Sequence, residues 1–172
     1  MIDALSSLKI NKSPGDDGLT TEFYKYFWND LSPIYLKVLR EIKEKKSLCP
    51  SQKRGMIVLA FKKGEKEILG NYRPITCMNV DMKIITHALA KRIASVISNL
   101  ISNTQKCVPG RQILKNLQLL QDLIDYINEK GDIGAAILLL DQEKAFDRMP
   151  HTFILKILRH FGFGEEIIDW IK

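Results

Sequence analysis

The 172-residue sequence has few of the residues that build disulfide frameworks or zinc centres. Its three cysteines, Cys49, Cys77 and Cys107, are far apart and form no CxxC pair. The three histidines make no ligand-spaced cluster with them. An odd number of widely separated cysteines favours reduced thiols, so the pattern disfavours both a disulfide scaffold and a structural zinc site.

Long apolar runs, low-complexity tracts and internal repeats are also absent. No stretch reaches the length that a membrane span needs, and the first residues lack the pattern of a signal peptide. We therefore expect an intracellular protein with no membrane partner. The content of 45% hydrophobic and 27% charged residues is typical of a globular domain, and the length suffices for one domain with a real core.

Charge of one sign is in modest excess, because 26 lysines and arginines stand against 20 aspartates and glutamates, a formal net charge of +6. Such an excess suggests an anionic partner, most commonly nucleic acid. Many ordinary proteins carry as much charge, so this feature alone leaves nucleic-acid binding open.

Apolar residues recur at three- and four-residue steps over 82–101, which predicts the strongest helix of the chain. Further helices are expected over 31–46, 112–128 and from Pro150 onward, and another after the turn at 11–19, capped by Asp17 or Thr20. Short apolar runs predict strands at 56–61 and 133–140. The expected fold class is α+β, helix-rich with a small central sheet. The buried residues of the last two helices should be Leu114, Leu117, Leu120, Ile124 and Ile127, then Phe153, Ile154, Ile157, Leu158 and Phe161.

Asp141 ends the apolar run in "AAILLLDQEKAFDRM", residues 135–149. A near-continuous apolar run indicates a strand buried on both faces, and a carboxylate there is costly unless a cation satisfies it. At the end of a rigid strand the carboxylate is well placed to bind a divalent metal. The alternative interpretation is that Asp141 only caps a turn.

Four segments, in order, carry a resemblance to one family. "LLLDQEKAFDRM" at 138–149 resembles motif A of reverse transcriptases, most closely that of the LINE-type, non-LTR retrotransposon enzymes. "NKSPGDDGLTTEFYKYF" at 11–27 resembles that family's N-terminal Ser-Pro-Gly-x-Asp-Gly motif. "IVLAFKKGE" at 57–65, together with "NYRPITCMNVDMKIITHALAKRI" at 71–93, resembles its fingers motif, and "VPGRQILKNL" at 108–117 resembles its next block. The match runs over essentially the whole chain.

The resemblance implies a partial right-hand polymerase, cut at both ends. Residues of about 1–130 would be the fingers and first palm helices, and about 131–172 the start of the palm. It further implies RNA-directed DNA polymerase activity by two-metal nucleotidyl transfer. The implied partners are an RNA template, a DNA primer, deoxynucleoside triphosphates and the remainder of a retroelement polyprotein, with a nuclear location by family analogy.

The resemblance also assigns roles to single residues. Asp141 would be catalytic and bind Mg²⁺, two ions being used in the complete enzyme, with the backbone carbonyl of Gln142 near a metal. Such ions lie about 4 Å apart and clamp the attacking and leaving oxygens. Phe146 would be the steric gate that excludes a ribose 2′-hydroxyl, beside the backbone of Ala145. Taken alone, Phe146 could equally be a core residue.

Arg73 would bind the incoming triphosphate, because a guanidinium fork binds phosphate oxygens in pairs, and Lys62 is a second candidate for this contact. Arg73 before Pro74 could instead be an exposed loop arginine, and Lys62 a solubilising charge. Four more residues would lie against template or other nucleic acid: Gly110, Arg111, Lys91 and Arg92. The flank of the helix at 82–101 could also be an ordinary solvated face.

Two departures from the family pattern limit these expectations. The sequence has no Tyr/Phe-x-Asp-Asp segment, and its adjacent aspartates, Asp16 and Asp17, lie in a turn rich in Pro and Gly. The family's usual Gly-Phe pair is replaced by Lys106 and Cys107 in "TQKCVPGR". With one carboxylate of the metal set and no thumb, residues 1–172 alone should not polymerise DNA.

Two rival interpretations belong to other classes. A non-catalytic basic module, or a decayed retroelement relic, would bind nucleic acid in a salt-sensitive way and be indifferent to magnesium and nucleotide. A phosphatase with a strand-end aspartate nucleophile would usually carry a second Asp two residues later, where this chain has Glu143.

Overall fold

The computed structural model describes residues 1–102, 104, 108, 110–131 and 136–172. It contains two compact units, Met1–Arg92 and Ile93–Lys172. The longest helix, α4 (Val80–Leu100), begins in the first unit and ends in the second. Its bounds confirm the helix predicted over 82–101. No helix in the described part of the chain is both long and apolar enough to cross a bilayer.

The first unit is built on α1 (Ile2–Ser7), α2 (Thr21–Tyr26), α3 (Trp28–Lys45) and the start of α4. The α2 helix begins after Thr20, whose side chain accepts a hydrogen bond from Phe23 N at 3.4 Å. Asp17 instead accepts from Leu19 N at 3.0 Å and shapes the preceding turn. Of the two predicted caps, Thr20 is therefore the helix cap.

A buried polar network joins α3 to the start of α4. The hydroxyl of Tyr35, in α3, donates to the backbone carbonyl of Asp81 at 2.7 Å. The buried side-chain amide of Gln52 donates to the Asp81 carboxylate at 2.8 Å, and its carbonyl accepts from Cys49 N at 3.1 Å. Burial first, then the charges of Asp81 and Asp17, raises the pKa of Tyr24 nearby to about 12.

The shift at Tyr24 has a definite sign for stability. Folding raises the pKa of this phenol above its ordinary value of 10.0, so the folded unit favours the neutral form. The corresponding stability is complete below pH 10 and is lost as the pH rises through about 12.

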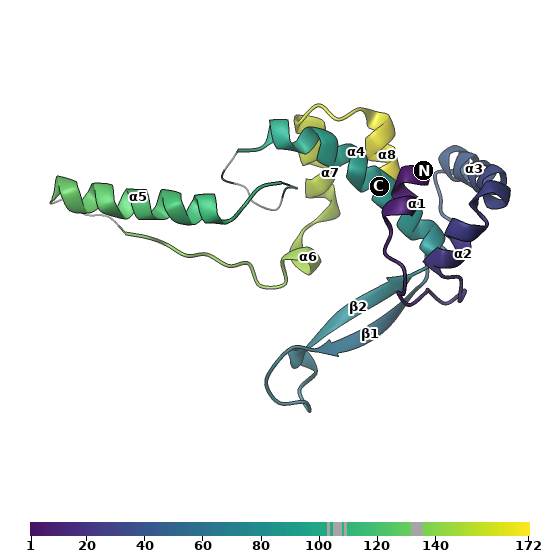
Figure 1. Ribbon diagram of the computed structural model, residues 1–172, viewed down its shortest axis with the longest axis horizontal. Helices are drawn as coiled ribbons and strands as arrows, with labels where there is room; N and C mark the ends of the chain where they lie inside the picture. Colours follow the sequence, from purple (N-terminus) through teal and green to yellow (C-terminus); the bar gives the residue numbers. More distant parts are fainter. Residues whose placement is uncertain (103, 105–107, 109, 132–135) are drawn as a thin grey trace. The chain divides into compact units, whose positions relative to one another are not determined.

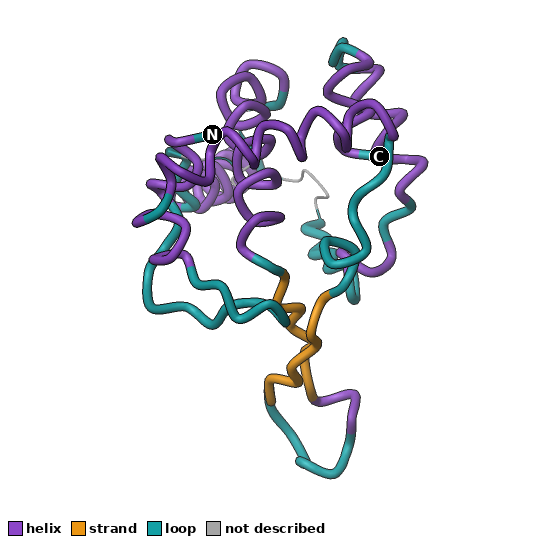
Figure 2. The backbone as a smooth tube through the Cα atoms, turned by 90° about the vertical axis from the view of Figure 1, so that its right-hand side faces the viewer, coloured by secondary structure: helices purple, strands orange, loops and turns teal. Residues whose placement is uncertain are grey.

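An antiparallel hairpin extends from the helices of the first unit (Figure 1). Its strands are β1 (Gly55–Phe61) and β2 (Tyr72–Met78), joined by a loop that includes the 3₁₀ turn η1 (Leu69–Asn71). The strand expected at 56–61 is confirmed. The sheet was expected to be central, but most residues of both strands are exposed, so it is a free ribbon. Figure 2 shows the loop closing its far end.

The described residues of the second unit carry the end of α4 and four further helices, α5 (Leu114–Lys130), α6 (Ala145–Arg148), α7 (His151–His160) and α8 (Glu165–Ile171). The Arg159 guanidinium binds both oxygens of Glu165, at 2.9 and 3.2 Å, and ties α7 to α8. The helices predicted over 112–128 and from Pro150 are confirmed, and Pro150 precedes α7 as its cap residue.

Two predictions for this unit are wrong. The α5 helix buries none of its residues, and Leu114 and Leu117 are more than half exposed. Phe153, Ile154 and Phe161 in and after α7 are also exposed. The strand predicted at 133–140 lies partly outside the described residues, and its described part, 136–140, forms no strand. A strand needs a neighbour for its backbone groups, and the described residues of this unit supply none.

Replacing Tyr35 by Phe should lower the free energy of unfolding of the first unit by about 1 kcal/mol, because it removes a part-buried hydrogen bond and little packing. Urea unfolding followed by Trp28 fluorescence measures this, with Trp170 changed to Phe to remove the second signal. The Tyr26→Phe variant is the control, because Tyr26 is 82% exposed. Equal stability of the two variants would contradict the structural role of the Tyr35 hydroxyl.

Candidate nucleotide and nucleic-acid site

Arg73 and Lys62 lie at the far end of the hairpin. Arg73 is opposite Ala60 in the ladder, and Lys62 follows Phe61, the last residue of β1. Opposite residues of an antiparallel pair share a face, and so do residues two apart along a strand. Arg73 and Lys62 are therefore expected on one face of the ribbon, and both are exposed. The register of the hairpin therefore places the two residues that were predicted to bind triphosphate close together along the ladder.

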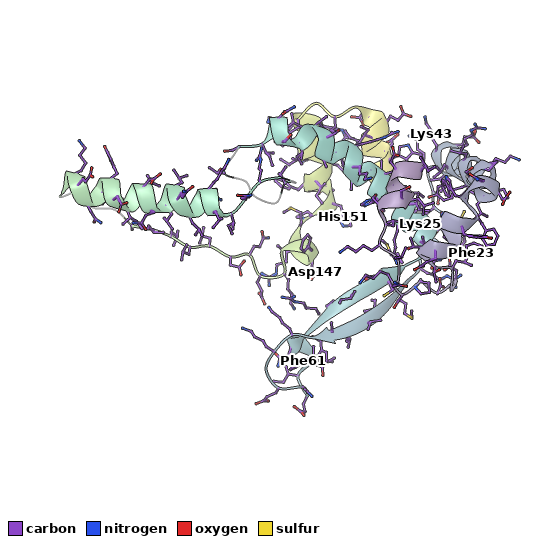
Figure 3. The ribbon with its side chains drawn as sticks, viewed as in Figure 1. Phe23, Lys25, Lys43, Phe61, Asp147 and His151 are labelled. Atoms are coloured by element: carbon purple, nitrogen blue, oxygen red, sulfur yellow. The ribbon has the colours of Figure 1, made fainter. Side chains whose placement is uncertain are left out.

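The loop beside these cations is held by two residues whose role the sequence analysis missed. Asn71 Nδ2 donates to the Glu65 carbonyl at 2.8 Å, and the Tyr72 hydroxyl donates to the Lys66 carbonyl at 2.9 Å. The Phe61 ring packs edge-on against Tyr72, 5.4 Å between centroids, at the hairpin end labelled in Figure 3. The sequence pointed to Asn71 and Tyr72 only through their position in the motif "NYRP", directly before Arg73.

Gly64 completes this loop. Its φ of +94° favours glycine, and a Cβ there would lie 2.6 Å from Asn71 Nδ2. The Lys62 backbone N–H also donates to the Asn71 carbonyl at 2.9 Å, so the loop closes directly on the strand ends. The hairpin end is thus a shaped platform for its exposed cations.

Asp141 and Gln142 lie in the second unit, in an exposed segment before α6. Ala145 is the first residue of α6, and Phe146 is 100% exposed, so the core interpretation of Phe146 is wrong. The one-turn helix follows Lys144, whose φ is +50°, and Arg148 pairs with Glu143 at 3.0 Å. The Arg148–Glu143 ion pair thus spans the turn that carries Phe146.

The described residues do not by themselves fit a two-ion magnesium centre. Among them, no three His, Cys, Asp or Glu side chains come together as a metal-binding group. Two magnesium ions need several carboxylate or other oxygen ligands, and Asp141 contributes one carboxylate. Any such centre therefore needs ligands beyond this set.

Arg111 has a structural role in the second unit, next to Gly110. Gly110 has φ +81°, in the left-handed region. The Arg111 guanidinium donates to the carbonyl of Ser98, in the last turn of α4, at 2.7 Å. It also donates to the carbonyls of the two residues after the helix, Ile101 at 3.2 Å and Ser102. Helix ends leave such carbonyls without intrahelical partners, so Arg111 caps α4. The nearby departures Lys106 and Cys107 lie outside the described residues.

Lys91 also has a partner within the chain. Its ammonium donates to the Asp3 carbonyl at 2.7 Å, and four residues earlier His87 Nε2 is 2.9 Å from Ser7 Oγ. Both contacts dock α1 on α4. Arg92 is exposed on α4 next to Lys91. Nucleic-acid contacts by Lys91, Arg92, Gly110 and Arg111 stay a prediction.

Replacing Arg111 by Ala should release the end of α4. We expect faster amide hydrogen exchange over residues 97–101, because about 1 kcal/mol or more is lost with charge-assisted hydrogen bonds. The Lys115→Ala variant, which also removes an exposed cation from this unit, should leave those rates unchanged. Similar rates in the two variants would mean that Arg111 does not stabilise this end.

Comparison with known proteins agrees with the motif order. Residues 60–172 match the family model described as "Reverse transcriptase (RNA-dependent DNA polymerase)". Over 170 residues, 98% of this chain, the sequence is 39% identical to the "Transposon TX1 uncharacterized 149 kDa protein" of Xenopus laevis. The chain spans 13% of that relative's length. The predicted family is confirmed: the chain belongs to the reverse transcriptases (RNA-dependent DNA polymerases), as a retrotransposon member.

Proposed function

We propose that residues 1–172 form the fingers and the first part of the palm of an RNA-directed DNA polymerase. The observation that carries this proposal is the end of the β1–β2 hairpin, where Arg73 and Lys62 share an exposed face beside a shaped loop. These cations bind the triphosphate of an incoming deoxynucleotide. Phosphoryl transfer depends mainly on positioning and charge neutralisation, which such groups supply.

The distribution of charge supports nucleic acid as the partner. Residues 1–92 hold 17 lysines and arginines against 10 acidic residues, whereas residues 93–172 hold 9 against 10. The whole basic excess is therefore in the unit that carries the hairpin. Neutralising phosphates with such cations releases counterions and gives sequence-independent, salt-sensitive affinity.

In the proposed enzyme, Asp141 would supply one carboxylate to a Mg²⁺ site, with the backbone carbonyl of Gln142 beside it and the other ligands coming from outside the described residues. Bound magnesium would neutralise charge on the reacting phosphates. Phe146, on α6 with Ala145, faces the sugar of the nucleotide and rejects a 2′-hydroxyl. RNA template and DNA primer are the proposed nucleic-acid partners, with the other parts of a retroelement protein.

A second candidate is a non-catalytic nucleic-acid-binding module. It is favoured by the basic first unit together with the absence of a metal-binding group among the described residues. It requires nothing of Asp141 or Phe146. These two residues therefore discriminate between the candidates.

The Asp141→Asn change should abolish DNA synthesis when residues 1–172 replace the matching segment of an active reverse transcriptase of the family. An amide is a far weaker ligand for magnesium than a carboxylate. The assay is primer extension on an RNA template, with retained binding of the primer–template showing that the protein is folded. Asp147→Asn is the matched control, expected to retain activity. Full activity of Asp141→Asn in an active chimera would remove Asp141 from the reaction.

The Phe146→Ala change in the same chimera should let ribonucleotides compete with deoxynucleotides, by about tenfold or more in relative kcat/KM. The side chain is fully exposed in this chain, so folding should be unaffected. Phe153→Ala, on α7, is the control for loss of an exposed phenylalanine. Unchanged sugar discrimination would show that Phe146 is not the gate.

A further inference from the structure

The position of the hairpin end is decided at its base. Most residues of β1 and β2 are exposed, so little else in the first unit supports the strands. One residue, Asn79, separates the end of β2 at Met78 from the start of α4 at Val80. Whatever fixes Asn79 therefore fixes the direction in which the ribbon leaves the helices.

Asn79 is held against Gly15 of the loop at 13–18. Asn79 is 3% exposed, and its Nδ2 donates to the Ser51 carbonyl at 3.4 Å. Its Oδ1 has no hydrogen-bond partner among the described residues and lies against Gly15. A Cβ on Gly15 would lie 2.6 Å from the Asn79 backbone N and 2.7 Å from its Cα. Glycine is required here for close approach, because backbone atoms cannot move aside cheaply.

The same loop contacts the chain on both sides of the hairpin base, before β1 and after β2. Asp16 pairs with Arg54, the residue before β1, at 3.8 Å. The Ser13 carbonyl accepts from Lys83, in the first turn of α4 after β2, at 3.5 Å. The exposed ion pair adds little energy by itself. Together with the Gly15–Asn79 contact, however, the ion pair connects the loop at 13–18 to the base of each strand.

We propose that the loop at 13–18 and Asn79 form a clamp that sets the angle of the β1–β2 hairpin, and that Gly15 and Asn79 are positioning residues for the nucleotide contact made by Arg73. The second part rests on the proposed function. The first part depends only on the packing at the hairpin base.

Because the hairpin is long, a small change of angle at its base displaces its far end by several ångströms. Seven residues of antiparallel strand span about 24 Å, so a change of about 10° at the base moves the far end by about 4 Å. A displacement of about 1 Å in a substrate-positioning group can cost a hundredfold in rate. A one-methyl change at Gly15 is thus amplified at Arg73.

The clamp is tested by spin-label distances between the hairpin loop and α3. Labels are placed at Lys63→Cys and Lys37→Cys, both exposed positions, with the native cysteines replaced by serine. The Gly15→Ala change should shift or broaden the distance distribution by several ångströms. The matched control is Gly70→Ala, where a Cβ would meet only Ile68 Cγ2, at 3.9 Å, and the distribution should be unchanged.

An unaltered distribution in folded Gly15→Ala protein overturns the clamp. If that variant does not fold, Asn79→Ala replaces it, because losing the amide removes the Ser51 bond and loosens the same contact. A broadened distribution in Asn79→Ala then supports the clamp, and an unaltered one overturns it.

The link to nucleotide binding is tested separately in the active chimera. Gly15→Ala should raise the KM for deoxynucleotide about tenfold with a smaller effect on kcat, as Arg73→Ala should do directly. If Arg73→Ala leaves KM unchanged, the proposed triphosphate contact fails while the distances still decide the clamp. If Arg73→Ala raises KM and Gly15→Ala does not, the positioning role of the clamp is overturned.

Discussion

The first unit depends on the junction between β2 and α4, where the chain passes from an exposed ribbon to a buried helix within one residue. Asp81 anchors this junction, because its carbonyl accepts from Tyr35 and its carboxylate from Gln52. Buried polar groups stabilise a fold only when their hydrogen bonds are satisfied, and this group joins α3, the segment after it and α4. Asp81 holds the α4 side of the junction, and the proposed clamp of Gly15 and Asn79 sets the direction of the hairpin on the other side.

The sequence predicted helices better than strands, because a strand needs a partner from elsewhere in the chain. Periodicity placed α3, α4, α5 and α7 correctly, because helical hydrogen bonds lie within one segment. No strand was predicted where β2 lies, and its Pro74 is a residue that central strands exclude. Proline is tolerated here since a two-stranded ribbon has only edge strands. The run at 136–140 was misassigned because apolar sequence cannot supply the pairing partner that a strand requires.

The same division applies to the candidate site. Motif order identified the family and singled out Arg73, Lys62 and Asp141, but it could not show what holds them. Arg111 and Lys91 donate hydrogen bonds to backbone carbonyls, of Ser98 and Asp3 respectively. Every residue has such a carbonyl, so the sequence does not show which of them is the acceptor. The contact of Gly15 with Asn79 joins residues 64 positions apart, so it too required the folded chain.

The free ribbon of β1 and β2 has a consequence for handling the protein. Among the residues that the structure describes, each strand has one hydrogen-bonding edge without a partner strand, and Ile57, Val58 and Ile75 are exposed on the two strands. Unpaired strand edges with apolar side chains are templates for strands from other molecules. Self-association at high concentration would begin there, and charges placed on the strands, rather than on the already charged helices, would oppose it.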